Sequence, residues 1–154
     1  MCAVGSSLVK FAASRQRSAR PLADVRMHPR PIDSPPALSG SVLLVEDDLD
    51  LLEFLAAYLE ARGARVVRAA TCELARAALA GERFDLLVSD IDLPDGNGHD
   101  LLLEARDRIA AAVALTGRRD GDSVDASRAA GFDAHLIKPC EPEILARVVA
   151  SLIS

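Results

Sequence analysis

The stretch Asp90-Ile91-Asp92-Leu93-Pro94-Asp95-Gly96-Asn97-Gly98 decides the fold of this chain. It follows an apolar run over residues 84–89 that is typical of a buried strand. Its proline and two glycines predict a tight, non-helical loop. Asp90 therefore stands where a strand ends and the chain turns towards solvent. In an open α/β sheet this is the end of the strand at which ligands bind, so the pattern predicts a carboxylate that faces a cleft.

Outward from this stretch, short apolar runs alternate with amphipathic segments. The apolar runs predict strands over residues 42–45, 65–69, 84–89, 110–115 and 133–137. Helical spacing and stop signals predict helices over residues 49–62, 72–80 (with Thr71 as N-cap), 99–108, 122–130 and from Pro142 onwards. Strict alternation predicts a doubly wound α/β fold, with a five-stranded parallel sheet in the flavodoxin-like order 2-1-3-4-5.

Length and composition bound the class of protein. A chain of 154 residues, half of them apolar, can bury one globular core. No apolar run approaches the length of a membrane span, so we expect a soluble protein without membrane contacts. The scattered Cys2, Cys72 and Cys140 argue against a disulfide framework or a zinc site, and they suit a reducing cytoplasm.

Charge is distributed unevenly along the chain. Residues 1–40 carry six Lys/Arg and two Asp/Glu, a balance of +4, whereas residues 41–154 carry 12 and 21, a balance of −9. An acidic body with only 3% aromatic residues does not suit nucleic acid, which needs positive charge and stacking surfaces. It favours basic partners or cations instead.

Residues 1–40 differ from the rest of the chain. Five of the eight prolines lie here among serines and arginines, which predicts a disordered tail before a domain spanning residues 41–154. Three other interpretations stay open: an organelle transit peptide, a basic arm for an acidic partner, or a true start at Met27.

The ends of four predicted strands carry the chemistry. The first strand ends at Glu46-Asp47-Asp48, the third at Asp90, the fourth at Thr116 and the fifth at Lys138. In the order 2-1-3-4-5 these ends line a single edge of the sheet, so we expect the side chains to lie close together.

Charge then predicts a ligand for this edge. Two like charges about 4 Å apart repel by about 1 kcal/mol in water and about 4 kcal/mol at an effective dielectric of about 20. The cluster of Glu46, Asp47 and Asp90 should therefore either raise the pKa of a carboxylate or take up a cation. Carboxylates without a nearby His or Cys suit Mg²⁺ best. A phosphoryl group transferred to Asp90 would bring further oxygens, which the metal, the Lys138 ammonium and the Thr116 hydroxyl can each bind.

Four stretches of the chain (residues 42–48, 85–98, 114–117 and 131–139) resemble the motifs of one family, in the right order and spacing. Residues 41–153 resemble the receiver domain of bacterial two-component response regulators, including those attached to hybrid histidine kinases. The resemblance implies that Asp90 is the phosphoacceptor and that Thr116 and Lys138 hold the phosphoryl oxygens. It also implies that Asp47 binds Mg²⁺ directly, Glu46 through water, and Asp92 through its backbone carbonyl.

The resemblance extends to the switch. His135 stands where the family often has an aromatic residue that changes rotamer, so Thr116 and His135 are the expected switch residues. The Lys138–Pro139 bond is often cis in the family, and the surface from the fourth helix through the fifth would read out the signal. Glu46 replaces the commoner aspartate, and Gly117 replaces a commoner alanine.

The expected function is two-component phosphorelay signalling. The protein would accept a phosphoryl group from the phosphohistidine of a sensor histidine kinase or a phosphotransfer protein, catalyse its own phosphorylation, and hydrolyse the product slowly. Without a DNA-binding output domain it would act on an unidentified target through protein contacts, either as a stand-alone receiver or as the severed end of a hybrid kinase. Two alternatives remain. One is a haloacid-dehalogenase-like phosphatase, in which Asp90 and Asp92 would be the nucleophile and the acid/base residue, and the other is a pseudo-receiver that is never phosphorylated.

Overall fold

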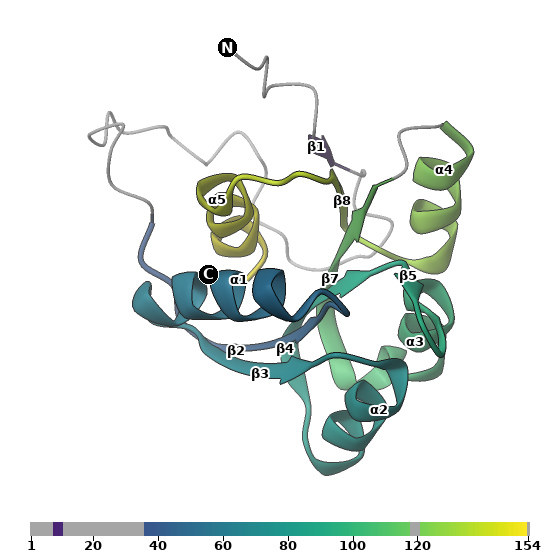
Figure 1. Cartoon of the computed structure of the whole chain (residues 1–154), viewed down its shortest axis with the longest axis horizontal. Coiled ribbons are helices and arrows are strands. Elements are labelled where there is room, and N and C mark those ends of the chain that lie inside the picture. Colours follow the sequence, from purple (N-terminus) through teal and green to yellow (C-terminus); the bar gives the residue numbers. More distant parts are fainter. Residues whose placement is uncertain (1–7, 11–35, 118–120, 154) are drawn as a thin grey trace.

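The computed structural model describes residues 8–10, 36–117 and 121–153. They form a six-stranded sheet in the order β1-β8-β7-β4-β2-β3 (Figure 1). In chain order the strands are β1 (Leu8–Lys10), β2 (Ser41–Val45), β3 (Arg65–Ala69), β4 (Phe84–Asp90), β7 (Ile109–Thr116) and β8 (Ala134–Ile137). The loop after Asp90 adds a small hairpin of β5 (Asp92–Leu93) and β6 (Gly96–Asn97).

The five strands β2, β3, β4, β7 and β8 are parallel, and their order matches the predicted 2-1-3-4-5. The flavodoxin-like fold is therefore confirmed. A sixth strand, β1, pairs antiparallel with the outer edge of β8. It comes from the segment for which the sequence predicted no regular structure. The predicted tail also includes residues 36–40, which the structure describes, and residues 1–7 and 11–35, which lie outside the described residues.

The helices are α1 (Leu49–Ala61), α2 (Cys72–Gly81), α3 (Gly98–Glu104), α4 (Gly121–Ala130) and α5 (Pro142–Ile153). The predicted helix over residues 99–108 is shorter than expected, because Ala105 leaves the helical region at φ −114° and ψ 21° and the chain continues as the 3₁₀ turn η3 (Arg106–Arg108). Across the described ranges, none of the helices has both the length and the apolar character to cross a bilayer.

Two apolar layers enclose the sheet. The α1 and α5 helices pack on one face, and α2, α3 and the end of α4 pack on the other (Figure 1). Successive side chains of a strand point to opposite faces. Val42 and Leu44 of β2 therefore join the first layer, while Leu43 and Val45 join the second. Burial on both faces explains why the central strands read as continuous apolar runs.

Polar side chains fix the helix starts next to the carboxyl edge of the sheet. Asp48 accepts hydrogen bonds from the first backbone N–H groups of α1, and Thr71 does the same for α2, as predicted. The carboxylate of Asp95, in the hairpin turn, accepts hydrogen bonds from the N–H groups of Cys72 at 2.8 Å and Glu73 at 3.0 Å. The loop after Asp90 is thereby tied to the start of α2.

The packed structure begins a few residues before Ser41. Leu38 is buried, and its N–H donates to the carbonyl of Arg62 at 2.7 Å. The chain can pass this close only because Gly63 ends α1 at φ +113°, where a β-carbon would collide with the carbonyl oxygen of Leu38.

We expect Gly63→Ala to lower the free energy of unfolding by about 1–3 kcal/mol, because alanine is strained at positive φ and has no room beside Leu38. Gly81→Ala is the matched control. Gly81 has ordinary φ and open space around it, so its replacement should leave stability unchanged or raise it by up to about 1 kcal/mol. Urea unfolding measures both, and equal effects of the two substitutions would contradict this explanation.

Candidate functional site

The carboxyl ends of four neighbouring parallel strands build one site. Glu46 and Asp47 directly follow β2, Asp90 ends β4, Thr116 ends β7 and Lys138 directly follows β8. The strand register brings them level, since Val45 pairs with Ser89, Asp90 with Leu115, and Thr116 with Ile137. The prediction that these residues share one edge of the sheet is confirmed.

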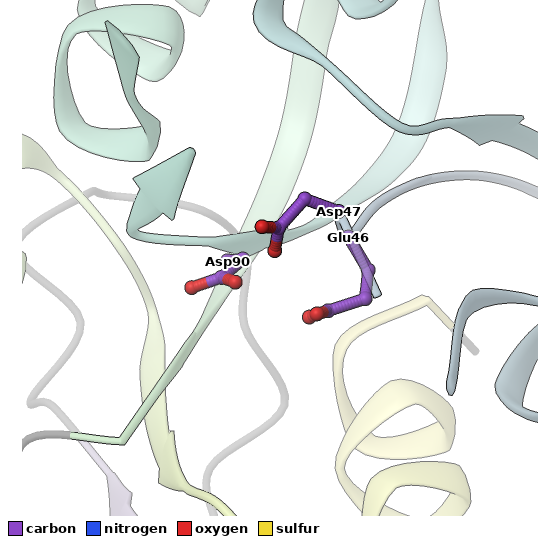
Figure 2. A group of neighbouring side chains, drawn as sticks. All are labelled: Glu46, Asp47 and Asp90. Atoms are coloured by element: carbon purple, nitrogen blue, oxygen red, sulfur yellow. The ribbon is translucent and has the colours of Figure 1, made fainter. Parts of the chain in front are cut away.

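Three carboxylates converge in this site (Figure 2). Glu46, Asp47 and Asp90 each offer an oxygen atom, and these atoms all lie within 4.8 Å of one another. Glu46 and Asp90 are 1% and 5% exposed, whereas Asp47 is open to solvent. A set of carboxylate oxygens without histidine or cysteine fits a hard divalent cation, and the open Asp47 gives such an ion access. The cluster can therefore hold a metal ion.

Lys138 joins the two buried carboxylates. Its ammonium Nζ donates to Glu46 Oε2 at 2.6 Å and to Asp90 Oδ2 at 3.0 Å. Burial raises the pKa of both Glu46 and Asp90, and the hydrogen bond from Lys138 opposes the rise in each. Burial acts to lower the pKa of Lys138 itself, but the hydrogen bonds and the negative charges of the two carboxylates together outweigh this and raise it. One ammonium thus serves two carboxylates, and a further positive charge is favoured here.

Backbone groups hold Asp90 from the other side. The N–H of Asp92 donates to Asp90 Oδ1 at 3.1 Å, so each carboxylate oxygen has its own donor. The loop returns close to the strand end, where the N–H of Gly98 donates to the carbonyl of Ile91 at 2.9 Å. A β-carbon on Gly98 would lie 2.5 Å from the Asp90 carbonyl oxygen, so only glycine fits here. The loop therefore fixes the orientation of the Asp90 carboxylate.

Thr116 completes the edge between Asp90 and Lys138. It is fully buried at the end of β7, and its carbonyl accepts a hydrogen bond from the N–H of Lys138 at 2.7 Å. The Lys138–Pro139 peptide bond is cis, as the sequence resemblance implied. Asp92, by contrast, is exposed at the start of β5.

Comparison with known proteins identifies this arrangement. Residues 42–150 match the family described as the response regulator receiver domain. The chain belongs to this family. The match spans all four strand ends that carry the site, and it confirms the family resemblance found in the sequence.

Relatives and solved structures agree with the assignment. The chain is 36% identical over 123 residues to the transcriptional regulatory protein AruR of Pseudomonas aeruginosa, which is 76% of this chain and 50% of AruR. A CheY-like receiver domain protein from Methanospirillum hungatei is 31% identical with a TM-score of 0.67, over 73% of this chain and 91% of that one. A response regulator from Clostridium difficile is 32% identical with a TM-score of 0.68, over 73% and 94%. The chain thus spans about half the length of AruR.

Sequence reasoning missed Ser127 and His99, which lie beside the predicted switch residue His135. His135 is fully buried in β8, and its Nδ1 lies 3.0 Å from the Oγ of Ser127 in α4. The same Oγ lies 3.1 Å from Nε2 of His99. A hydroxyl carries one proton, so Ser127 can donate to one imidazole and accept from the other. This hydrogen-bonded chain connects α3, α4 and β8 of the receiver domain.

The missed residues had weak signals in the sequence. Ser123, Ser127 and Ala130 recur at helical spacing and form the buried face of α4, but they are too small and polar to stand out as a core stripe. His99 is half-buried at the start of α3, and its ring meets that of Phe132 edge to face at 5.9 Å between centroids. No pattern in the sequence around His99 indicated that α4 would contact its side chain.

The burial of His99 makes the free energy of unfolding depend on pH. Burial lowers the pKa of His99 from 6.5, although the nearby carboxylates of Asp100 and Asp92 act to raise it. The unfolded chain then binds this proton more readily than the folded chain, so stability is lost as the pH falls through 6.5. We expect His99→Gln to reduce the loss of unfolding free energy between about pH 7 and about pH 5. Urea unfolding and NMR titration of the imidazole measure this, and a His99 pKa above 6.5 would contradict it.

Proposed function

We propose that this receiver domain is a phosphorylation-controlled switch in which the Asp90 carboxylate accepts a phosphoryl group with the help of Mg²⁺. The phosphoryl donor would be the phosphohistidine of a sensor histidine kinase or of a phosphotransfer protein. The observation that carries the proposal is the position of Asp90, within 4.8 Å of the oxygens of Glu46 and Asp47 and 3.0 Å from the Lys138 ammonium.

Each residue of the site has a separate role in this transfer. An Asp90 carboxylate oxygen attacks phosphorus, a P–O bond forms, and the P–N bond to the donor imidazole breaks as that imidazole takes up a proton. Lys138 and the Thr116 hydroxyl would bind the oxygens of the new phosphoryl group. The hydrogen bond from the Asp92 N–H to Oδ1 keeps the carboxylate oriented during the approach.

The acidic cluster explains the need for a divalent ion. Three carboxylates and one ammonium leave the site net negative before any phosphate arrives, so an incoming anion is repelled. Bound Mg²⁺ would supply the missing positive charge. We propose Asp47 and Asp90 as direct ligands, Glu46 as a ligand through water, and the backbone carbonyl of Asp92 as a further ligand.

Phosphorylation would be read out through β7, β8 and α4. Ala114 pairs with His135, and Thr116 lies two residues further along β7, so Thr116 and His135 project from the same face of the sheet. His135 reaches Ser127 of α4 on this face. A shift of Thr116 towards a phosphoryl oxygen would therefore be passed to His135 and α4, which makes Thr116 and His135 the proposed switch residues.

The proposed setting is the cytoplasm, with a downstream protein target. The domain would catalyse its own phosphorylation and hydrolyse the acyl phosphate slowly. The acidic balance of residues 41–154 favours protein partners over nucleic acid for this domain.

Incubation with acetyl phosphate and Mg²⁺ should add one phosphoryl group that is acid-labile, sensitive to hydroxylamine and located on Asp90 by mass spectrometry. Asp90→Asn should lose the label, because the amide is not a nucleophile. Asp107→Asn, which removes an exposed carboxylate in η3, should keep it.

Label that persists in Asp90→Asn, or that resists hydroxylamine, would contradict the acceptor assignment. Rapid turnover of small phosphate esters would instead indicate a phosphatase. The complete absence of label with acetyl phosphate would indicate a pseudo-receiver.

A further inference from the structure

The outer edge of β8 is covered by a strand from outside the parallel sheet. Without β1, β8 would be the edge strand and would expose a row of unpaired N–H and C=O groups. In the structure β1 lies beside β8 (Figure 1). Leu8 pairs with Leu136, Val9 with His135 and Lys10 with Ala134. Of the six strands, β1 alone runs antiparallel to its neighbour.

This pairing is short and depends on a long covalent connection. Three residues of β1 engage β8, whereas β4 and β7 share six register pairs. Residues 11–35 separate β1 from the described start of the domain at Pro36. A two-stranded contact of this length is marginal by itself, so the tether is what keeps β1 at the edge. A segment held in this way can be replaced by a competitor that pairs over more residues.

Charge also favours a basic strand at this position. The segment that supplies β1 belongs to residues 1–40, with a balance of +4, and it docks on a body with a balance of −9. Lys10 is itself one of the three paired residues. A competitor should therefore be extended, apolar and positively charged, as Leu8-Val9-Lys10 is.

The edge is connected to the rest of the domain through β8. His135, opposite Val9, contacts Ser127 of α4, and β8 leads directly into Lys138, which binds Glu46 and Asp90. Any strand that pairs with this edge therefore contacts β8, which connects the acidic site to α4.

We propose that the outer edge of β8 is a strand-addition surface for an extended, apolar, positively charged segment of a partner protein, and that Leu8–Lys10 is the built-in competitor for it. Main-chain hydrogen bonds to β8 would provide the affinity, in the antiparallel register that β1 shows. The proposal does not depend on phosphorylation of Asp90.

The test compares two variants of the full chain. Adjacent N–H groups of a strand point to opposite sides, so one of Leu8 and Val9 donates towards β8. Leu8→Pro/Val9→Pro removes both donors and should free the edge, whereas Leu8→Ile/Val9→Ile keeps the donors and the strand preference. By hydrogen exchange, the β8 amides that face β1 should exchange at least tenfold faster in the proline variant and at the wild-type rate in the isoleucine variant.

A second measurement tests whether the freed edge binds a partner strand. The probe is a fluorescent peptide copying residues 5–13, and binding is followed by anisotropy up to millimolar peptide. It should bind the proline variant at least tenfold more tightly than the wild-type chain or the isoleucine variant. The same peptide with prolines in place of Leu8 and Val9 should not bind.

Unchanged exchange in the proline variant would overturn the assignment of β1 as the cover of this edge. Faster exchange without peptide binding, or equal binding to all three proteins, would overturn the strand-addition surface. Far-UV circular dichroism of both variants serves as the control for folding, and it should match the wild-type spectrum because β1 lies outside the parallel sheet.

Discussion

One ammonium group between two buried carboxylates governs the structure of this receiver domain. Lys138 donates to both Glu46 and Asp90, and these hydrogen bonds oppose the rise in pKa that burial causes in the two carboxyl groups. Removing one partner of a buried ion pair typically costs about 3–5 kcal/mol, because the other charge is left uncompensated. Here the compensation is incomplete from the start, since Asp47 adds a third carboxylate to the cluster. The site is therefore arranged to bind further positive charge.

The parallel sheet brings residues from distant parts of the chain together in this site. Four of the five parallel strands supply functional side chains at or directly after their carboxyl ends, and the crossover helices return the chain to the opposite edge before the next strand begins. Residues as distant as Glu46 and Lys138, 92 positions apart, thus meet at 2.6 Å. The loop after Asp90 then fixes the carboxylate through the close approach of Gly98 and the N–H of Asp92.

The fold and the site could be predicted because both depend on local patterns. Apolar runs, caps such as Thr71 and the charged residues at strand ends are visible in the sequence, and the parallel order follows from their alternation. What could not be predicted depends on pairing between distant segments. Nothing local marks Leu8–Lys10 as a strand, because its structure comes from the open edge of β8. Ser127 gains its role only from the two histidines that the fold places on either side of it.

The central claim is that a divalent cation and a phosphoryl group bind to the same cluster of charged side chains, so that the binding of each strengthens the binding of the other. The most direct test is the Mg²⁺ affinity measured by calorimetry with and without beryllofluoride, which takes the place of a phosphoryl group on a carboxylate. The account predicts at least tenfold tighter Mg²⁺ binding with beryllofluoride, loss of this gain in Asp47→Asn, and retention in Asp50→Asn, which removes a carboxylate of α1 outside the cluster. Mg²⁺ affinity that is the same with and without beryllofluoride would contradict it.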